Sequence, residues 1–166
     1  MPRRGQRKSP AADEKPGVKV VVQNRQASFR YHILERYEAG MALTGSEVKS
    51  LREGGANLRD AYALVRRGEL WLEKCHIAPY RSAGYAQHHP LRTRKLLLHK
   101  DEIFKLGGRV QEKGLALVPL RIYFKNGRAK CELGLARGKK VYDRRAEARR
   151  RIVEREIAAE LERYRE

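Results

Sequence analysis

The stretch LALVPLRIYFKNGRAKCELGL, residues 115–135, decides the fold. Apolar residues alternate with others on both sides of Asn126-Gly127, which is typical of half-buried strands. Asn-Gly supplies the positive φ angles of a type I′ turn, so the stretch predicts a β-hairpin. Pro119 cannot donate to a strand ladder and indicates an edge position or a bulge. The predicted apolar face consists of Ala116, Val118, Leu120, Ile122 and Phe124, then Ala129, Cys131, Leu133 and Leu135 on the return strand.

Two other segments have strand character. Residues 29–43 alternate in the same way, which predicts one long half-buried strand. Glu35 falls on the apolar face of that strand and therefore favours a bulge there. The segment AYALVRRGELWLEKCHI, residues 61–77, predicts a second hairpin that turns at residues 66–69.

Two short helices are predicted between the strands. Thr44 and Glu47 form the pattern of a capping box, and Gly54-Gly55 follows the helix as a stop signal. The second helix lies within residues 99–114, where Ile103, Leu106 and Val110 share one face.

These elements predict a mainly β fold. Five or six antiparallel strands with two or three short helices, and no ~30-residue βαβ unit, favour a closed or partly closed barrel over a parallel sheet. We expect a six-stranded barrel of the oligonucleotide-binding (OB) type. The predicted organisation is a disordered basic extension at residues 1–17, the barrel at 18–136 and a basic C-terminal tail at 137–166.

The tail has the composition of a helix without a core. Past Gly138 it contains no Gly or Pro, and basic residues occur on every face of its first half. We expect it to be disordered when free and helical when bound to a polyanion, because isolated helices of this length are marginal in water. The alternative is a charged helix that packs on its own barrel through the stripe Val153, Ile157, Leu161 and Tyr164.

Charge indicates the class of partner. The 166 residues contain 38 Lys and Arg against 20 Asp and Glu, a formal net charge of +18. Such a surplus attracts a phosphate backbone. No run approaches ~20 apolar residues, so we expect no membrane association. The N-terminal residues lack the apolar segment of a signal peptide, which favours the cytoplasm.

Catalytic motifs are not evident. Cys75 and Cys131 have no CxxC partner, so we expect small buried hydrophobes in strands rather than zinc ligands. Histidines and carboxylates lack metal-ligand spacing, and neither a GxxxxGK[ST] nor a GxSxG motif occurs. We therefore predict no enzyme activity, cofactor or metal. The open alternative is a metal-dependent nuclease that assembles acidic residues from distant strands.

Basic residues cluster beside a leucine run. Arg92, Arg94 and Lys95 precede Leu96-Leu97-Leu98, and Arg25 and Arg30 flank the start of the first long strand. Such cations suit phosphates, while nearby rings can stack on unpaired bases or simply pack in the core. Three consecutive leucines cannot all face one core in a strand, so we expect one of them, Leu97, to be exposed. The candidate stacking rings are Tyr31, Tyr37, Tyr62, Tyr80, Tyr85 and His99.

Three blocks in this order and spacing carry a family resemblance: YEAGMALTGSEVKSLREGGANLRDAYA, RTRKLLLH and GLARGKKVYDRR. From about residue 24 to residue 145 the chain closely resembles the tmRNA-binding proteins of bacterial trans-translation, the small protein B (SmpB) family. The resemblance implies an OB-type barrel that binds the elbow of the tRNA-like part of tmRNA. It further implies that the complex, with alanyl-tmRNA and elongation factor Tu bound to GTP, enters 70S ribosomes stalled without a codon.

The resemblance also implies two groups of site residues and a division of labour between them. The tail would enter the vacant mRNA channel at the decoding site, become helical and replace codon–anticodon pairing, and a degradation tag would follow. The chain would act as a monomer. His99 replaces an Asn of some members, and Tyr142 replaces a common His. The tmRNA-binding group is Asn24, Arg25, Glu38, Arg92, Arg94, Lys95, Leu97 and His99. The ribosome-binding group is Arg137, Lys139, Lys140, Tyr142, Asp143, Arg144 and Arg145.

Two other functions remain open from the residues alone. A general rRNA-binding or ribosomal protein would explain the charge and the barrel but not the three blocks. An RNA-processing enzyme would require turnover of an RNA substrate. Affinity for tmRNA compared with a tRNA and an rRNA fragment at raised salt separates the adaptor from the general binder.

Overall fold

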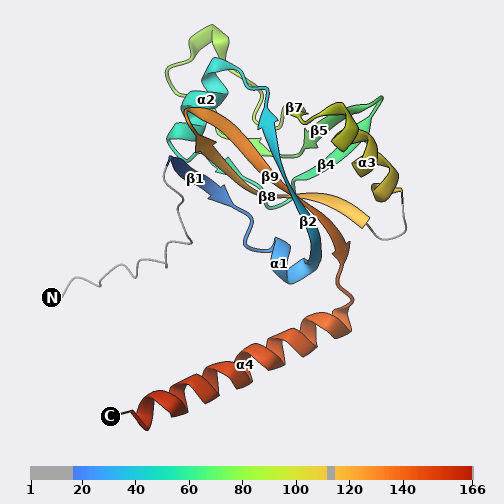
Figure 1. Cartoon of the computed structure of the whole chain (residues 1–166). Coiled ribbons are helices and arrows are strands. Elements are labelled where there is room, and N and C mark those ends of the chain that lie inside the picture. The colour runs from blue at the N-terminus through green and yellow to red at the C-terminus, as the bar shows by residue number, and fades with distance from the viewer. Residues whose placement is uncertain (1–16, 112–114, 166) are drawn as a thin grey trace, which may run out of the picture.

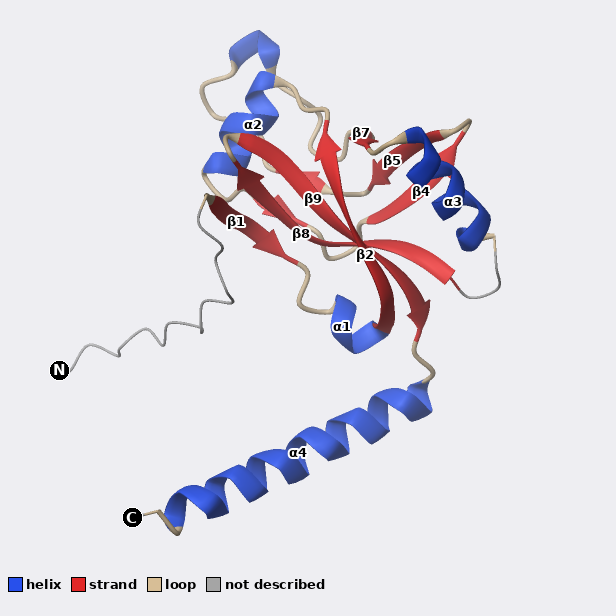
Figure 2. Ribbon diagram, viewed as in Figure 1, coloured by secondary structure: helices blue, strands red, loops and turns tan. Residues whose placement is uncertain are grey.

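A closed antiparallel barrel forms the body of the protein in the computed structural model, which describes residues 17–111 and 115–165 (Figures 1 and 2). Strands β8, β4, β5, β7, β2 and β9 pair in that order, and the β8–β9 hairpin closes the ring, with β1 added along β8. The predicted mainly β, six-stranded barrel is therefore confirmed. The predicted extension at residues 1–17 falls almost entirely outside the described residues.

The elements follow one another along the chain. The barrel strands are β1 (Val18–Gln23), β2 (Tyr31–Met41), β4 (Tyr62–Arg66), β5 (Glu69–Glu73), β7 (Arg94–Leu97), β8 (Leu115–Lys125) and β9 (Arg128–Gly138). The strands β3 (Ala56–Asn57) and β6 (His76–Ile77) form a separate small pair. The helices are α1 (Ala27–Arg30), α2 (Gly45–Arg52), the 3-10 turn Gly84–Ala86, α3 (Lys100–Val110) and α4 (Val141–Arg163).

The predicted turns and helix signals are confirmed. Asn126 and Gly127 have φ angles of 51° and 76°, as a type I′ turn requires. The β4–β5 hairpin turns at Arg67 and Gly68, also with positive φ. Thr44 precedes α2, and its backbone N–H donates to Glu47 Oε1 at 3.0 Å.

The prediction that β8 buries a single face is wrong. The bulge that Pro119 indicated is confirmed, because the pairing with β9 shifts register between Pro119 and Arg121, where proline cannot donate a ladder hydrogen bond. Leu117, Ile122 and Phe124 consequently point into the barrel core, whereas Val118 and Leu120 belong to a second apolar cluster. A bulge reverses the alternation of inward and outward side chains, which a fixed period of two does not anticipate.

The second cluster involves α1 and corrects another prediction. Residues 29–30 were expected in the long strand, but they belong to α1, and β2 begins at Tyr31. Ala27 of α1 is buried against Val118, Leu120 and Ala136. The bulge predicted at Glu35 is confirmed by a register shift between Ile33 and Glu35.

Both cysteines are buried and free. Cys131 lies in β9 as predicted, but Cys75 lies between β5 and β6 rather than in a strand. Burial raises the pKa of the Cys75 thiol to about 11, which keeps it protonated and unreactive at neutral pH.

Candidate nucleic-acid interface

The end of β2 and the strand β7 form a hollow of about 600 Å³. Glu38 and Gly40 come from β2, Leu97 comes from β7, and His99 immediately precedes α3. Gly40 pairs with Leu97 across the two strands, and a Cβ at Gly40 would stand only 3.3 Å from Leu97 Cβ. The structure therefore brings together Glu38, Leu97 and His99, three residues of the predicted tmRNA-binding group. The remaining residues that line the hollow are Arg36, Tyr37, Leu98, Glu102 and Lys130.

Leu97 is exposed, as predicted. It is 52% exposed, whereas Leu96 beside it is 1% exposed and lies in the barrel core. An apolar side chain held on the surface by a rigid strand is a feature expected of a contact site.

Glu38 is held as an anion. It accepts a hydrogen bond from the Tyr123 hydroxyl and lies 3.4 Å from Lys125 Nζ. The Tyr123 hydrogen bond is the main cause that lowers the pKa of Glu38 below its usual value, and Lys125 adds to the effect. A fixed carboxylate can accept hydrogen bonds from base amino groups or hydroxyls.

His99 is the N-cap residue of α3, but its ring does not cap the helix. The imidazole makes no capping hydrogen bond, while the His99 carbonyl accepts from Ile103 N–H at 3.0 Å. The ring therefore remains on the rim of the hollow with both nitrogens able to meet a partner.

Arg94 does not belong to the open surface. It is fully buried, and its guanidinium donates to Glu47 and, at 2.6 Å, to the Cys75 carbonyl oxygen. The expectation that Arg94 contacts phosphate does not fit this position. Its role here is to fix the start of β7, the strand that presents Leu97.

Glu47 is the centre of this buried cluster. Its side chain is fully buried and accepts from Arg94, from Arg92 at 2.6 Å and from Thr44 N–H. Burial raises the pKa of Glu47, but the Arg92, Thr44 and Arg94 bonds outweigh it and lower the pKa to about 2. A capping box was the only role that the sequence indicated for Glu47, since nothing local links it to arginines more than 40 residues away.

The other residues predicted to bind tmRNA do not line this hollow. Lys95 points outward from β7, and its Nζ lies 3.1 Å from Glu69 Oε1. Asn24 lines a different hollow near α1 and donates to the Pro119 carbonyl at 3.1 Å. Arg25 next to it is exposed.

The predicted ribosome-binding residues lie at the junction of β9 and α4. Lys139 is buried, and its Nζ donates to the Ser28 carbonyl of α1 at 2.7 Å and to Glu147. It therefore anchors α4 to the barrel instead of facing outward. Asp143 lies 4.0 Å from His32 Nε2. Arg137, Lys140 and Arg145 are exposed, Arg144 is half-buried, and the side chain of Tyr142 lies outside the described part of the structure.

Beyond this junction, α4 extends away from the barrel as a separate rod (Figure 1). Val153, Ile157 and Leu161 are more than half exposed, and Tyr164 is 88% exposed. The alternative in which this stripe packs on the barrel is therefore wrong.

No metal centre or membrane span is found in the described chain. Within residues 17–111 and 115–165, no three His, Cys, Asp or Glu side chains gather as a metal site would require. The described helices include none that is both long and apolar enough to cross a membrane.

The fold and the surface together define a class: a small basic β-barrel protein with an exposed hollow lined by apolar and charged side chains and with a protruding basic helix. The sequence model described as SmpB protein matches residues 21–163, nearly the whole chain. The chain belongs to the SmpB family, which confirms the resemblance stated from its motifs. The match also continues through the tail beyond residue 145, where the motifs end.

Individual relatives agree. The chain is 59% identical over 140 residues to the SsrA-binding protein of Desulforudis audaxviator (strain MP104C), covering 84% of this chain and 92% of that protein. It is 54% identical over 149 residues to the SsrA-binding protein of Trichodesmium erythraeum (strain IMS101), covering 89% and 96%. A chain from the solved structure "tmRNA-SmpB: a journey to the center of the bacterial ribosome" superposes with a TM-score of 0.62 at 55% identity, covering 72% of this chain and 85% of that one.

Proposed function

We propose that this protein is an RNA-binding adaptor of trans-translation that binds tmRNA (SsrA RNA). The single observation that carries the proposal is the hollow in which Glu38 meets Leu97 and His99. Glu38 lies about 60 residues before the other two in the sequence, and the resemblance to the family assigns all three positions to tmRNA binding. In this proposal Leu97 packs against the elbow of the tRNA-like part, while Glu38 and His99 form hydrogen bonds with its bases.

The proposed role of the tail is separate. Helix α4 carries the basic residues that would enter the decoding site and the empty mRNA channel of a stalled 70S ribosome. The side chains of α4 are exposed along most of its length, which supports a role in which a partner surrounds the helix. The complex would be delivered with alanyl-tmRNA and elongation factor Tu bound to GTP, by a monomer in the cytoplasm.

The hollow is tested by a substitution with a matched control. Leu97→Asp places a charge where an apolar contact is proposed, and we expect tmRNA affinity to fall roughly 10–100-fold, equivalent to about 1.4–2.8 kcal/mol. Leu91→Asp is the control, because Leu91 is similarly exposed, at 49%, but does not line the hollow. Filter binding at raised salt measures both variants.

The alternatives are tested in the same assay. Equal affinity of the wild-type protein for tmRNA, a tRNA and an rRNA fragment would contradict the adaptor and favour a general RNA binder. Multiple turnover of any of these RNAs with added magnesium would contradict the absence of catalysis.

A further inference from the structure

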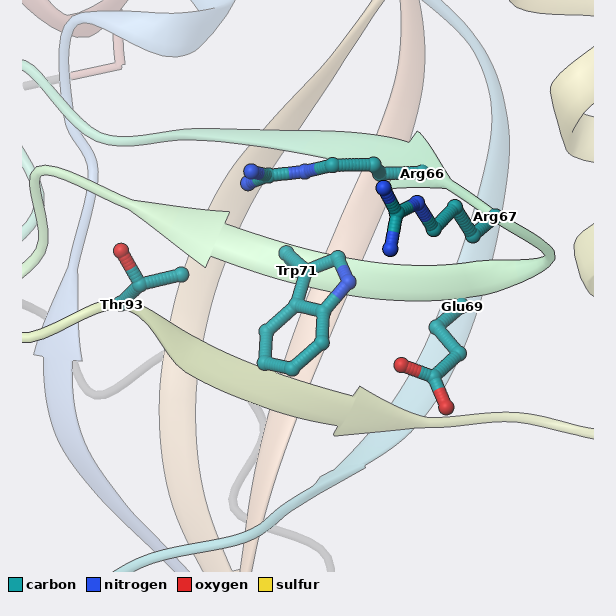
Figure 3. A pocket seen from close by; sticks show the side chains of 5 residues that line it. All are labelled: Arg66, Arg67, Glu69, Trp71 and Thr93. Carbon is teal, nitrogen blue, oxygen red and sulfur yellow. The ribbon is translucent and has the colours of Figure 1, made fainter.

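The only tryptophan of the chain lies in a second hollow, on the outer face of the barrel. Trp71 is in β5 between Leu70 and Leu72, which are both fully buried, so alternation directs the indole outward. The hollow measures about 500 Å³ and is lined by Arg66, Arg67, Glu69, Trp71 and Thr93 (Figure 3).

The charges around Trp71 leave one cation available. Arg66 pairs with Glu73 at 3.2 Å, and Lys95 pairs with Glu69 at 3.1 Å. Arg67, by contrast, has no ion pair or hydrogen bond with any residue that the structure describes. Figure 3 shows its guanidinium extending from the hairpin toward the indole. The hollow therefore combines an accessible ring with an unneutralised positive charge.

The backbone at Arg67 is also unusual. Its φ of 52° is in the left-handed region, at a turn position that Asn or Gly ordinarily occupies. The β8–β9 hairpin has Asn126 at the matching position. Arginine is thus placed here against the backbone preference, which is a reason to look for a function of its side chain.

Strand β7 connects this hollow to the first one. Lys95 pairs with Trp71 of β5, and Leu97 pairs with Gly40 of β2. Residues two apart in a strand face the same side, so Lys95 and Leu97 both point outward. The Trp71 surface and the Leu97 surface are therefore neighbours on one continuous face of the barrel.

We propose that Trp71 and Arg67 form a second RNA contact, which receives an unpaired nucleotide of the same RNA that the Leu97 hollow holds. The base stacks on the indole, and Arg67 contacts the adjoining phosphate. Stacking on aromatic rings accepts any base, and an arginine beside the ring supplies the backbone contact. This inference rests on the proposed function, because it requires tmRNA to be bound across β7.

The tryptophan itself is the probe. Since Trp71 is the only tryptophan, selectively excited indole emission reports this hollow alone in the unmodified full-length protein. Titration with the isolated tRNA-like fragment of tmRNA should change the emission with saturation at one RNA per protein, and should protect the indole from acrylamide quenching. An unchanged emission at saturation would overturn the inference.

Variants test the chemistry of the contact. Trp71→Leu, which retains apolar bulk without a stacking ring, and Arg67→Glu should each weaken fragment binding about 10-fold. Trp71→Phe should stay within about 3-fold, because it keeps a ring. The controls are Phe104→Leu and Arg81→Glu, an exposed aromatic and an exposed arginine that line neither hollow, and both should bind as the wild type does.

The outcomes separate the two proposals. Normal binding by the Trp71 and Arg67 variants together with a defect in Leu97→Asp would overturn the inference and leave the proposed function intact. An emission change that appears only with ribosomal subunits would also overturn it, since the contact would then belong to rRNA. Failure of wild-type protein to prefer tmRNA would overturn the proposed function itself.

Discussion

Strand β9 and helix α4 follow one another in the chain but are stabilised in different ways. Leu133 and Leu135 of β9 are fully buried in the barrel core, and both neighbouring strands pair with it. The large apolar side chains Ile152, Val153, Ile157 and Leu161 of α4 are exposed. The anchorage of α4 to the barrel lies at its start, through Lys139 and Glu147.

The difference shows which part of the protein depends on a partner. The barrel satisfies its own strand ladder and buries its own apolar surface, so its structure is specified within the chain. Beyond its first turns, α4 gains little from tertiary packing, and helices of this kind are marginal in water. We infer that the barrel carries a preformed binding surface, whereas the tail gains its full stability only on the surface that it binds.

The largest effect is expected when α4 is deleted and the barrel is kept. A chain truncated after Lys140 keeps the hydrogen bond from Lys139 to the Ser28 carbonyl but loses α4, including Glu147. We expect tagging of nascent chains on stalled ribosomes to be abolished, because the part proposed to occupy the mRNA channel is gone. The measurement is tag addition in a reconstituted translation system, with the full-length chain as control. Substantial tagging by the truncated chain would contradict a distinct role for α4.

The second prediction concerns the stability of the barrel alone. Glu47→Gln leaves the buried Arg94 without its counter-charge, and we expect the free energy of unfolding to fall by about 3–5 kcal/mol. Urea unfolding measures this effect. Glu53→Gln at the exposed end of α2 is the control and should be neutral.

The same residue predicts a pH dependence. The pKa of Glu47 is about 2 in the folded protein against an ordinary value of 4.5, so the unfolded chain binds more protons between these values. The contribution of Glu47 is therefore fully present above pH 4.5 and is lost as the pH falls toward 2. Glu47→Gln should lack this part of the acid dependence, and an identical slope in variant and wild type would contradict it.

A smaller effect is expected at the junction of the two regions. Lys139→Met keeps the buried stem but removes the amine that donates to the Ser28 carbonyl and to Glu147. The first turns of α4 should then exchange their amide hydrogens roughly tenfold faster, while β8 and β9 stay protected. Lys140→Met, at an exposed lysine, should change neither region. Faster exchange throughout the barrel would show that Lys139 supports the core instead.

The smallest effect is expected for Tyr142→Phe. If the ring stacks on an rRNA base, removal of the hydroxyl should leave tagging within about twofold. A phenol ring carries no positive charge at neutral pH, unlike a protonated imidazole, so stacking by Tyr142 would not require a cationic ring. Tyr142→Ala serves as the comparison that removes the ring. A severe defect in Tyr142→Phe would assign the function to the hydroxyl.

Local patterns predicted most of the elements. The Asn126-Gly127 turn, the Thr44 capping box and the exposed Leu97 each depend on residues close together in the chain, and each is found where it was expected. The family motifs also located Glu38, Leu97 and His99, which the structure brings into one hollow.

Long-range pairing explains what the patterns missed. The bulge after Pro119 reverses which side chains of β8 face the barrel core. That reversal depends on the pairing with β9, which the pattern within β8 does not contain. The sequence pattern predicts a surface role for Arg94, but the structure buries Arg94 in an ion pair with Glu47. Lys139 likewise looks like part of a basic tail, but the Ser28 carbonyl more than 100 residues away accepts its hydrogen bond.

The central claim is that the barrel binds RNA without help from α4. The direct test is the affinity of the chain truncated after Lys140 for the tRNA-like fragment of tmRNA, measured beside full-length protein and the truncated Leu97→Asp variant. We expect truncation to change the affinity by no more than about 3-fold, and Leu97→Asp to weaken it roughly 10–100-fold in either background. A loss on truncation as large as that caused by Leu97→Asp would contradict the claim, because tmRNA binding would then require the tail.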